Sequence, residues 1–489
     1  MKVKLPFSIL PILGLSGMPS FFVFAVLLPA FSVAQEITVS EEVHLRSDKS
    51  YEIIGMLNNE TLLFRDHNSS YDVQGFDQEM QLSWTKELEL DKKQPKVLGV
   101  QQIEDEFVVI YRFRQRSKTI VKVHRYDSRA NLLDSVTVKN FGFQFSTPLF
   151  EVVRSEDRSK ILIYHIEKQK ILKALVFDIP SMTVMWEKGI QPKKMQYPRD
   201  WEDLLVDDQG NMHLILSKDN YRSKRKTHYF QVHQYYGMQD QVKQFNLPMQ
   251  DKLSFDVNFN VDNRNNQLVA AGLYGVKTVS KAMGYYYLRI PLDNHESHSL
   301  RFHEFEEDML NAFLEKKVKK NRGLVDAVMD DVVLRRDGGI LAIIEKAKLY
   351  ERRPGSTPRS FNDPFVRTMV DYYHEEMYIV SIHPDGRKHW GTILHKKQYS
   401  QDEDAVFASY FLFTTPSSLR FIFNDEIKYE NTVSEYVLRG DGTFKRNSVL
   451  NTKDLKIRMR FRDATQVNAK VLLVPSEMRN RLKIVKLQY

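Results

Sequence analysis

Short apolar runs recur along the chain, and polar turn residues flank each of them. Five of the seven intervals between the eight runs measure 46 to 54 residues. The runs occupy residues 62–64, 108–110, 162–164, 214–216, 268–270, 341–343, 421–423 and 471–473. A regular interval of this length is typical of a four-stranded propeller blade of roughly 40–50 residues. The pattern therefore predicts an all-β repeat protein.

Each unit shows the alternation of apolar and polar residues expected of four strands. The second unit is the clearest, with strands predicted at 96–103, 107–113, 119–126 and 132–139. A period of two is typical of a strand that buries one face. Asp-Gly pairs at 337–338, 385–386 and 441–442 mark turns between strands.

Three of the four tryptophans support the same register. Trp84, Trp186 and Trp390 each fall in the predicted fourth strand of their unit. The alternative interpretation is that they are scattered core aromatics.

Two intervals are longer, and each contains a visible insertion. Residues 306–322 show an apolar stripe at helical spacing, formed by Met309, Leu310, Phe313, Leu314 and Val318. This stripe predicts one short helix that packs on the domain, with docking to a membrane or a partner as the alternative. Residues 346–367 form a loop rich in Pro and Arg.

The two ends of the chain predict how the ring closes. The last unit shows only three strands, near 457–461, 470–475 and 482–488, and one strand at 36–45 precedes the first unit. Pairing the N-terminal strand into the last blade protects both sheet edges. We therefore predict an eight-bladed β-propeller, with seven blades as the alternative.

The N-terminus predicts export. Lys2 and Lys4 precede an apolar run at 5–33, and Ser32-Val33-Ala34 offers small residues for cleavage. We predict a signal peptide at 1–34, a single propeller domain at 35–489 and a secreted or periplasmic protein that is not transmembrane after cleavage. An uncleaved membrane anchor is the alternative, because the run is long enough to span a bilayer. The absence of cysteine excludes disulfides, thiolate metal sites and a lipid anchor on cysteine.

The segment 384–391, with the sequence PDGRKHWG, resembles the turn-then-tryptophan motif of quinoprotein-like eight-bladed propellers. In layout the chain is similar to secreted β-propellers of Bacteroidota, and the Ala-Gln-Glu junction after the apolar run fits that group. The resemblance implies a fold and no activity. It carries over no residue that would bind a quinone, so no cofactor is predicted.

The chain shows none of the common catalytic motifs, and we predict no catalytic residues and no metal site. His295, Glu296 and His298 are interpreted as a solvated turn. The run 372–376, Tyr-Tyr-His-Glu-Glu, offers groups that a lyase or hydrolase could use, but its alternation favours a plain strand. The pair Asp330–Asp331 is interpreted as solvated charge.

Loop charge separates by face in an antiparallel meander, because successive turns alternate between its two ends. The loops between second and third strands sum to roughly +12, and the opposite turns to roughly −11. We predict one acidic face and one basic face, and the basic face has Tyr221, Tyr350 and Phe361 interleaved among its cations and binds carboxylate, sulfate or phosphate. The predicted binding residues are Arg114, Arg116, Lys118, Tyr221, Arg222, Lys224, Arg225, Lys226, Arg352 and Arg353. The alternative is that these loops carry charge for solubility alone.

These observations favour a non-catalytic binding or scaffold propeller. Its expected partner is an acidic protein or an anionic polysaccharide of the cell envelope, and export argues against nucleic acid. The alternative function is a polysaccharide lyase or hydrolase with its site at the propeller axis. A quinoprotein-like oxidoreductase is the third hypothesis. The sequence does not identify the partner or the oligomeric state.

Overall fold

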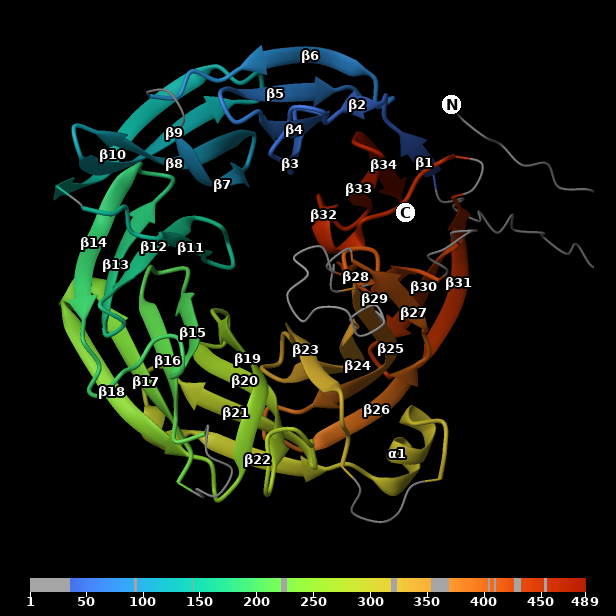
Figure 1. The fold of residues 1–489 in the computed structure, drawn as a ribbon. Helices are drawn as coiled ribbons and strands as arrows, with labels where there is room; N and C mark the ends of the chain where they lie inside the picture. Colours follow the sequence, from blue (N-terminus) through green and yellow to red (C-terminus); the bar gives the residue numbers. More distant parts are fainter. Residues whose placement is uncertain are drawn as a thin grey trace, which may run out of the picture.

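The computed structural model describes residues 36–91, 95–143, 145–220, 227–317, 323–352, 369–402, 405–408, 410–425, 432–452 and 455–489. Eight antiparallel sheets stand around a common axis and form a closed ring (Figure 1). The predicted eight-bladed propeller is confirmed, and the seven-bladed alternative is wrong. The predicted signal peptide lies outside the described residues.

The first four blades each contain four consecutive strands. Blade 1 consists of β3 (Ser50–Leu57), β4 (Glu60–Asp66), β5 (Tyr71–Phe76) and β6 (Leu82–Glu87). Blade 2 consists of β7 (Lys96–Ile103), β8 (Glu106–Gln115), β9 (Lys118–Asp127) and β10 (Leu132–Phe143). Blade 3 consists of β11 (Glu151–Arg154), β12 (Lys160–Glu167), β13 (Ile171–Asp178) and β14 (Thr183–Ile190). Blade 4 consists of β15 (Trp201–Val206), β16 (Met212–Lys218), β17 (Tyr229–Tyr236) and β18 (Gln241–Pro248).

The other four blades include the two departures from this plan. Blade 5 consists of β19 (Leu253–Asp262), β20 (Gln267–Gly275), β21 (Gly284–Pro291) and β22 (Ser299–Glu304). Blade 6 consists of β23 (Ala327–Leu334), β24 (Ile340–Arg352), β25 (Met369–Ile382) and β26 (Lys388–Leu394), with β27 (Gln398–Gln401) on β25. Blade 7 consists of β28 (Tyr410–Thr414), β29 (Ser418–Asn424), β30 (Thr432–Arg439) and β31 (Phe444–Asn451). Blade 8 consists of β32 (Thr465–Gln466), β33 (Val471–Met478), β34 (Arg481–Gln488) and β1 (Glu36–Val39), with β2 (Val43–His44) on β34.

All eight predicted apolar runs lie in the second strand of their blade, from β4 in blade 1 to β33 in blade 8. These strands are buried on both sides because each sheet packs against a neighbouring sheet. In the junction of blades 2 and 3, for example, Ile110 and Val121 pack with Ile161 and Phe177. The repeated apolar runs in the sequence therefore correspond to the second strands, which are buried between neighbouring blades.

The tryptophan register is also confirmed, since Trp84, Trp186 and Trp390 lie in the fourth strands β6, β14 and β26. The Trp186 indole donates a 2.7 Å hydrogen bond to the carbonyl of Gly210 in the next blade. The Trp390 indole donates likewise to Gly440 at 3.0 Å. Two of the three tryptophans thus tie neighbouring blades together.

The N-terminal strand closes the ring as predicted, because β1 pairs with β34 over four residues. The strand predicted at 457–461 is wrong. Ile457, Met459 and Phe461 are buried in the core, but a single bridge from Met459 to Ser476 replaces a ladder. A short 3₁₀ turn, Phe461–Asp463, follows, and β32 takes the innermost position.

The predicted helix is present but short, as α1 (Glu307–Phe313). Met309, Leu310 and Phe313 are buried against blades 5 and 6, so the apolar stripe packs on the domain. Val318 and most of the Pro- and Arg-rich loop lie outside the described residues. No helix among the described residues is long and apolar enough to cross a membrane.

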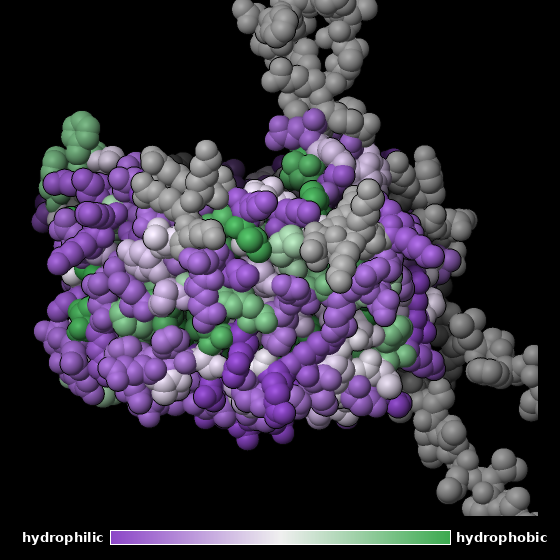
Figure 2. All heavy atoms as spheres, turned by 90° about the horizontal axis from the view of Figure 1, so that it is seen from below, coloured by the Kyte–Doolittle hydropathy of each residue, from purple (hydrophilic) through white to green (hydrophobic). Residues whose placement is uncertain are grey.

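The two ends of the ring carry different connections. We call one end the hairpin face, which carries the turns between second and third strands and the connections between blades. The other is the turn face, where Gly338 and Gly386 occupy left-handed turns at φ +84° each. Seen from its edge, the ring shows a mostly hydrophilic surface with hydrophobic side chains scattered among polar ones (Figure 2).

Candidate functional site

Three of the predicted binding residues lie in the described part of the chain, on the blade 2 hairpin. Arg114 lies near the end of β8, Arg116 in the turn and Lys118 at the start of β9, and all three side chains are exposed on the hairpin face. Tyr221, Arg222, Lys224, Arg225, Lys226 and Arg353 lie outside the described residues. Arg352 ends β24, and only its backbone is described.

Two further cations that the loop analysis missed lie beside Arg114. Lys96 on β7 is the direct antiparallel partner of Arg112 on β8. Directly opposite residues point to the same side of a sheet, and so do residues two apart in one strand. Lys96, Arg112 and Arg114 therefore form a row, here called the blade 2 cation row.

The blade 2 cation row faces the junction with blade 3. Arg112 is the register partner of Val121, which packs on blade 3 residues Ile161 and Phe177. Burial lowers the pKa of Arg112, and the neighbouring positive charge of Arg114 lowers it further. Among the described residues, neither Lys96 nor Arg112 has a carboxylate partner. Two arginines held side by side in this way favour the binding of an anion.

Carboxylates gather at a different place, the hairpin-face end of the innermost strands. We call them the axial carboxylates, and they come from five blades: Glu52, Glu151, Glu202, Asp203, Asp256, Asp330 and Asp331. Solvent still reaches Glu52, Asp256 and Asp330. These innermost strands therefore bring seven carboxylates to the hairpin-face end, with the cation of Arg154 near Glu52 and the exposed cations of the blade 2 hairpin farther from the axis.

β-Bulges place three of these side chains. The register shifts in β15, β19 and β23 leave Glu202, Asp256 and Asp330, respectively, opposite no partner. A bulge re-aims a side chain and is common at the rims of closed sheets. The equivalent bulge residues in blades 1 and 2 are Ile54 and Leu98, so an acidic residue occupies the bulge in blades 4 to 6 and an apolar residue occupies it in blades 1 and 2.

Two axial carboxylates have a pKa close to neutral. Burial raises the pKa of Glu202 to about 7, and the charges of Asp203 and Asp256 add to this shift against an opposing hydrogen bond from Ser217. Burial likewise raises the pKa of Asp203 to about 6. At neutral pH, Glu202 can therefore donate a proton while Asp203, with a pKa of about 6, remains largely ionised.

Asp330 is exposed, in agreement with its interpretation as solvated charge, whereas Asp331 is half-buried. Desolvation raises the pKa of both carboxyl groups, and the charge of Glu345 raises that of Asp330 further. The Tyr410 hydroxyl donates a hydrogen bond to Asp330 from the innermost strand of blade 7. Asp330 is therefore a partnered side chain at the junction of two blades.

The run 372–376 lies within β25, so its interpretation as a strand is confirmed. Its His374 approaches Glu345 at 2.7 Å, and the Lys396 ammonium lies 2.5 Å from the same carboxylate. Burial alone would raise the pKa of Glu345, but Lys396 and His374 hold it below its ordinary value. This buried cluster joins blade 6 to the connection that leads into blade 7.

Glu315, Glu376 and His395 place one ligand atom each within 4.8 Å of one another. Lysines already neutralise both carboxylates, because Lys397 lies 3.1 Å from Glu315 and Lys346 lies 3.2 Å from Glu376. The group is explained as a set of ion pairs. His295 and Glu296 occupy a 3₁₀ turn that ends at His298, as the sequence predicts.

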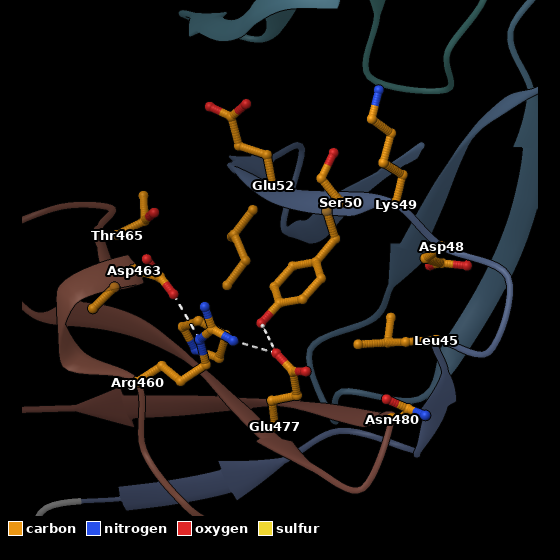
Figure 3. A pocket seen from close by; sticks show the side chains of 14 residues that line it. Leu45, Asp48, Lys49, Ser50, Glu52, Arg460, Asp463, Thr465, Glu477 and Asn480 are labelled. Carbon is orange, nitrogen blue, oxygen red and sulfur yellow. Dashed lines mark hydrogen bonds and ion pairs between the residues drawn. The ribbon is translucent and has the colours of Figure 1, made fainter. Parts of the chain in front are cut away.

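A cavity of about 600 Å³ lies between blades 8 and 1, where the ring closes (Figure 3). Arg460 reaches Asp463 at 2.6 Å and also pairs with Glu477, whose carboxylate accepts a 3.1 Å hydrogen bond from Tyr51. These partners occupy the guanidinium of Arg460. These polar contacts link blade 8 to blade 1 where the ring closes. The guanidinium of Arg460 is already paired and is not available to bind an anion.

Comparison with known proteins supplies no family. No protein-family model matches the chain, and no curated protein matches it. The solved structure of BamB from Moraxella catarrhalis matches 93% of this chain and 100% of that chain, with 14% identity and a TM-score of 0.39. A europium-containing methanol dehydrogenase matches 90% of this chain and 85% of that chain, with 8% identity and a TM-score of 0.41. TolB from Acinetobacter baumannii matches 79% and 78%, with 11% identity and a TM-score of 0.28, and none of these likenesses assigns a function to this chain.

Proposed function

We propose that this protein is a non-catalytic binding or scaffold propeller, exported to the periplasm or beyond. It recognises an anionic glycan or an acidic protein surface through the basic hairpins of its hairpin face. The blade 2 cation row, continued by Arg116 and Lys118, is the core of this site. The observation that carries the proposal is that Lys96 and Arg112 lack carboxylate partners among the described residues.

The chemistry of these side chains supports an anionic partner. A guanidinium binds a carboxylate, sulfate or phosphate through two parallel hydrogen bonds, and a second arginine alongside adds charge without adding flexibility. A partly buried cation without a counter-charge costs free energy. A bound anion would offset both this cost and the repulsion between Arg112 and Arg114. Export is supported by the apolar run and the small residues that follow it.

The first prediction concerns binding to immobilised polyanions. Wild-type protein is expected to bind heparin or polygalacturonate and to release it as salt rises, because salt screens exposed charges. The double charge reversal Arg112→Glu and Arg114→Glu should weaken binding about tenfold or more. Retention on a column and titration by biolayer interferometry measure this difference.

A matched control comes from the turn face. Arg264 and Arg336 are both exposed there, in the turns between the first and second strands of blades 5 and 6. Their double reversal to glutamate changes the net charge equally and should leave binding unaltered. Equal losses in both double variants would reduce the effect to net charge and would contradict the proposed site.

A second candidate function is hydrolysis or lysis of a polysaccharide at the axis. The observation that favours it is the raised pKa of Glu202, about 7, beside Asp203 and Asp256 on the innermost strands. A proton donor next to an ionised carboxylate, here Asp203, is the arrangement that glycosidic bond cleavage requires. Release of reducing ends from acidic polysaccharides by wild type, and its loss in Glu202→Gln, would establish this function over the first.

A further inference from the structure

Three large apolar side chains project from the segment that leaves blade 2. The side chains of Phe143, Phe145 and Leu149 are 73%, 95% and 69% exposed, and Phe145 is the most exposed of the large hydrophobic residues described. Single exposed apolar residues are ordinary on a protein surface. Three within seven positions of one short connection need an explanation.

Aromatic packing fixes both ends of this segment on the domain, and the exposed side chains lie between the two ends. Phe141 and Phe150 pack together with ring centroids 4.8 Å apart, and both rings contact His165 of blade 3, at 5.5 and 5.2 Å. Phe150 is buried and belongs to the core between blades 2 and 3. The chain therefore leaves the core at Phe141 and returns to it at Phe150, with the exposed side chains between.

Two cations lie beside the start of the segment. Phe143 is the antiparallel partner of Lys118, which follows Arg116 in the adjacent hairpin, and both cations are exposed. Other hairpins of the same face repeat the combination. Tyr350, 44% exposed, lies under the Lys348 ammonium at 4.2 Å, and Val276, 43% exposed, precedes Lys277.

The exposed hydrophobic residues of the turn face differ in kind. Several occupy the first positions of outermost strands: Leu82, Leu132, Leu133, Val184, Val242 and Phe444. There they belong to a strand whose outer side is free, and they do not project from a loop. Met238, 87% exposed in the 3₁₀ turn Gly237–Gln239, is a single projecting side chain of the turn face, whereas three project together from the hairpin-face segment that leaves blade 2.

We propose that the segment carrying Phe143, Phe145 and Leu149 docks the propeller onto the surface of an anionic lipid bilayer. Aromatic side chains favour the interfacial layer of a membrane, and neighbouring lysines and arginines are attracted to anionic headgroups. A protein partner would favour one continuous apolar patch, whereas separate tips among cations suit a layer of headgroups. Because the segment leaves an outermost strand, contact occurs at the rim and leaves the centre of the hairpin face open.

The inference goes beyond the proposed function, since it uses the projecting apolar side chains and not the blade 2 cation row. The test uses mature protein and vesicles of phosphatidylcholine, with or without phosphatidylglycerol. Wild type is expected to co-sediment with the anionic vesicles, and Phe143→Ser with Phe145→Ser should weaken binding about tenfold or more. In a Phe145→Trp variant, the new fluorescence should shift to the blue and be quenched by brominated lipid.

The matched control lies at the other end of the same strand. Leu132 and Leu133 are each 51% exposed at the start of β10, on the turn face. Their double change to serine removes similar apolar area and should leave vesicle binding intact.

The outcomes separate the two proposals. Binding to polyanions without binding to either vesicle, or equal losses in the two serine variants, would overturn docking to a bilayer and leave the proposed function standing. Capture of one envelope protein through the phenylalanines, with no vesicle binding, would also overturn it in favour of a protein partner. If the protein binds vesicles through Phe143 and Phe145 but does not bind polyanions, docking is supported and the proposed function is overturned.

Discussion

Burial lowers the pKa of Arg112 and raises the pKa of Glu202, and both shifts have the same physical cause. Burial disfavours the charged form of each, so it lowers the pKa of the arginine and raises the pKa of the glutamate to about 7. Like charges alongside, Arg114 in one case and Asp203 with Asp256 in the other, strengthen both shifts. Such groups reduce the stability of the folded protein, and they are common at sites that bind a ligand or transfer a proton.

Glu202 gives a prediction for stability against pH. Its pKa is higher in the folded state than in the unfolded chain, so the folded protein holds a proton that the unfolded chain loses first. Stability should therefore fall as pH rises from about 4.5 to about 7 and level off above that. Relative to wild type, Glu202→Gln should be more stable by about 1–2 kcal/mol at pH 8 and should lose that advantage below pH 4.5.

Thermal and urea unfolding of both proteins across that range measure the difference. A constant gap between Glu202→Gln and wild type at every pH would mean that the carboxyl group titrates normally.

At the scale of elements, the ring depends on the pairing of β1 with β34. Ile37 and Val39 also pack against the core of blades 7 and 8. Replacing both by aspartate should bury unpaired charge and expose the edge of β34. The free energy of unfolding should therefore fall by about 3 kcal/mol or more, and the urea midpoint should fall with it. Thr38→Ser, which keeps the strand and its pairing, is the control. An unchanged midpoint in the double variant would mean that blade 8 holds the ring closed without β1.

The sequence predicts elements well wherever burial and pairing coincide. The second strands are buried on both sides, so their apolar runs mark them directly, and the predicted bounds 96–103 match those of β7. At 457–461 the apolar residues are buried without a ladder, because they line the core from an irregular segment. Periodicity reports which side chains are buried and does not report which backbone groups pair.

The candidate site shows the same limit. Arg114, Arg116 and Lys118 could be assigned to one face because hairpin turns alternate by rule. Lys96 and Arg112 lie within strands, and only the register between β7 and β8 shows that they share a row with Arg114. The axial carboxylates depend on bulges in β15, β19 and β23, which local sequence does not reveal.

At the scale of the whole molecule, the charge of the described residues depends on the distance from the ring axis. Loop counting predicts one basic face and one acidic face, but it omits the innermost strands, which carry the axial carboxylates. An extended anion would therefore bind across the outer hairpins and avoid the centre, since like charges repel there. Rim contact with a bilayer and binding on the blade 2 cation row share Arg116 and Lys118, but the bilayer contact depends on Phe143, Phe145 and Leu149, and the row consists of Lys96, Arg112 and Arg114.

The central claim is that the hairpin face of blade 2 is the binding surface of this propeller. Hydrogen–deuterium exchange of the wild-type protein, with and without saturating heparin, tests it most directly because the whole backbone reports at once. We predict that added protection concentrates in residues 96–98 and 110–120. Protection confined to turn-face segments such as 207–210 and 383–387, or no protection at all, would contradict the account.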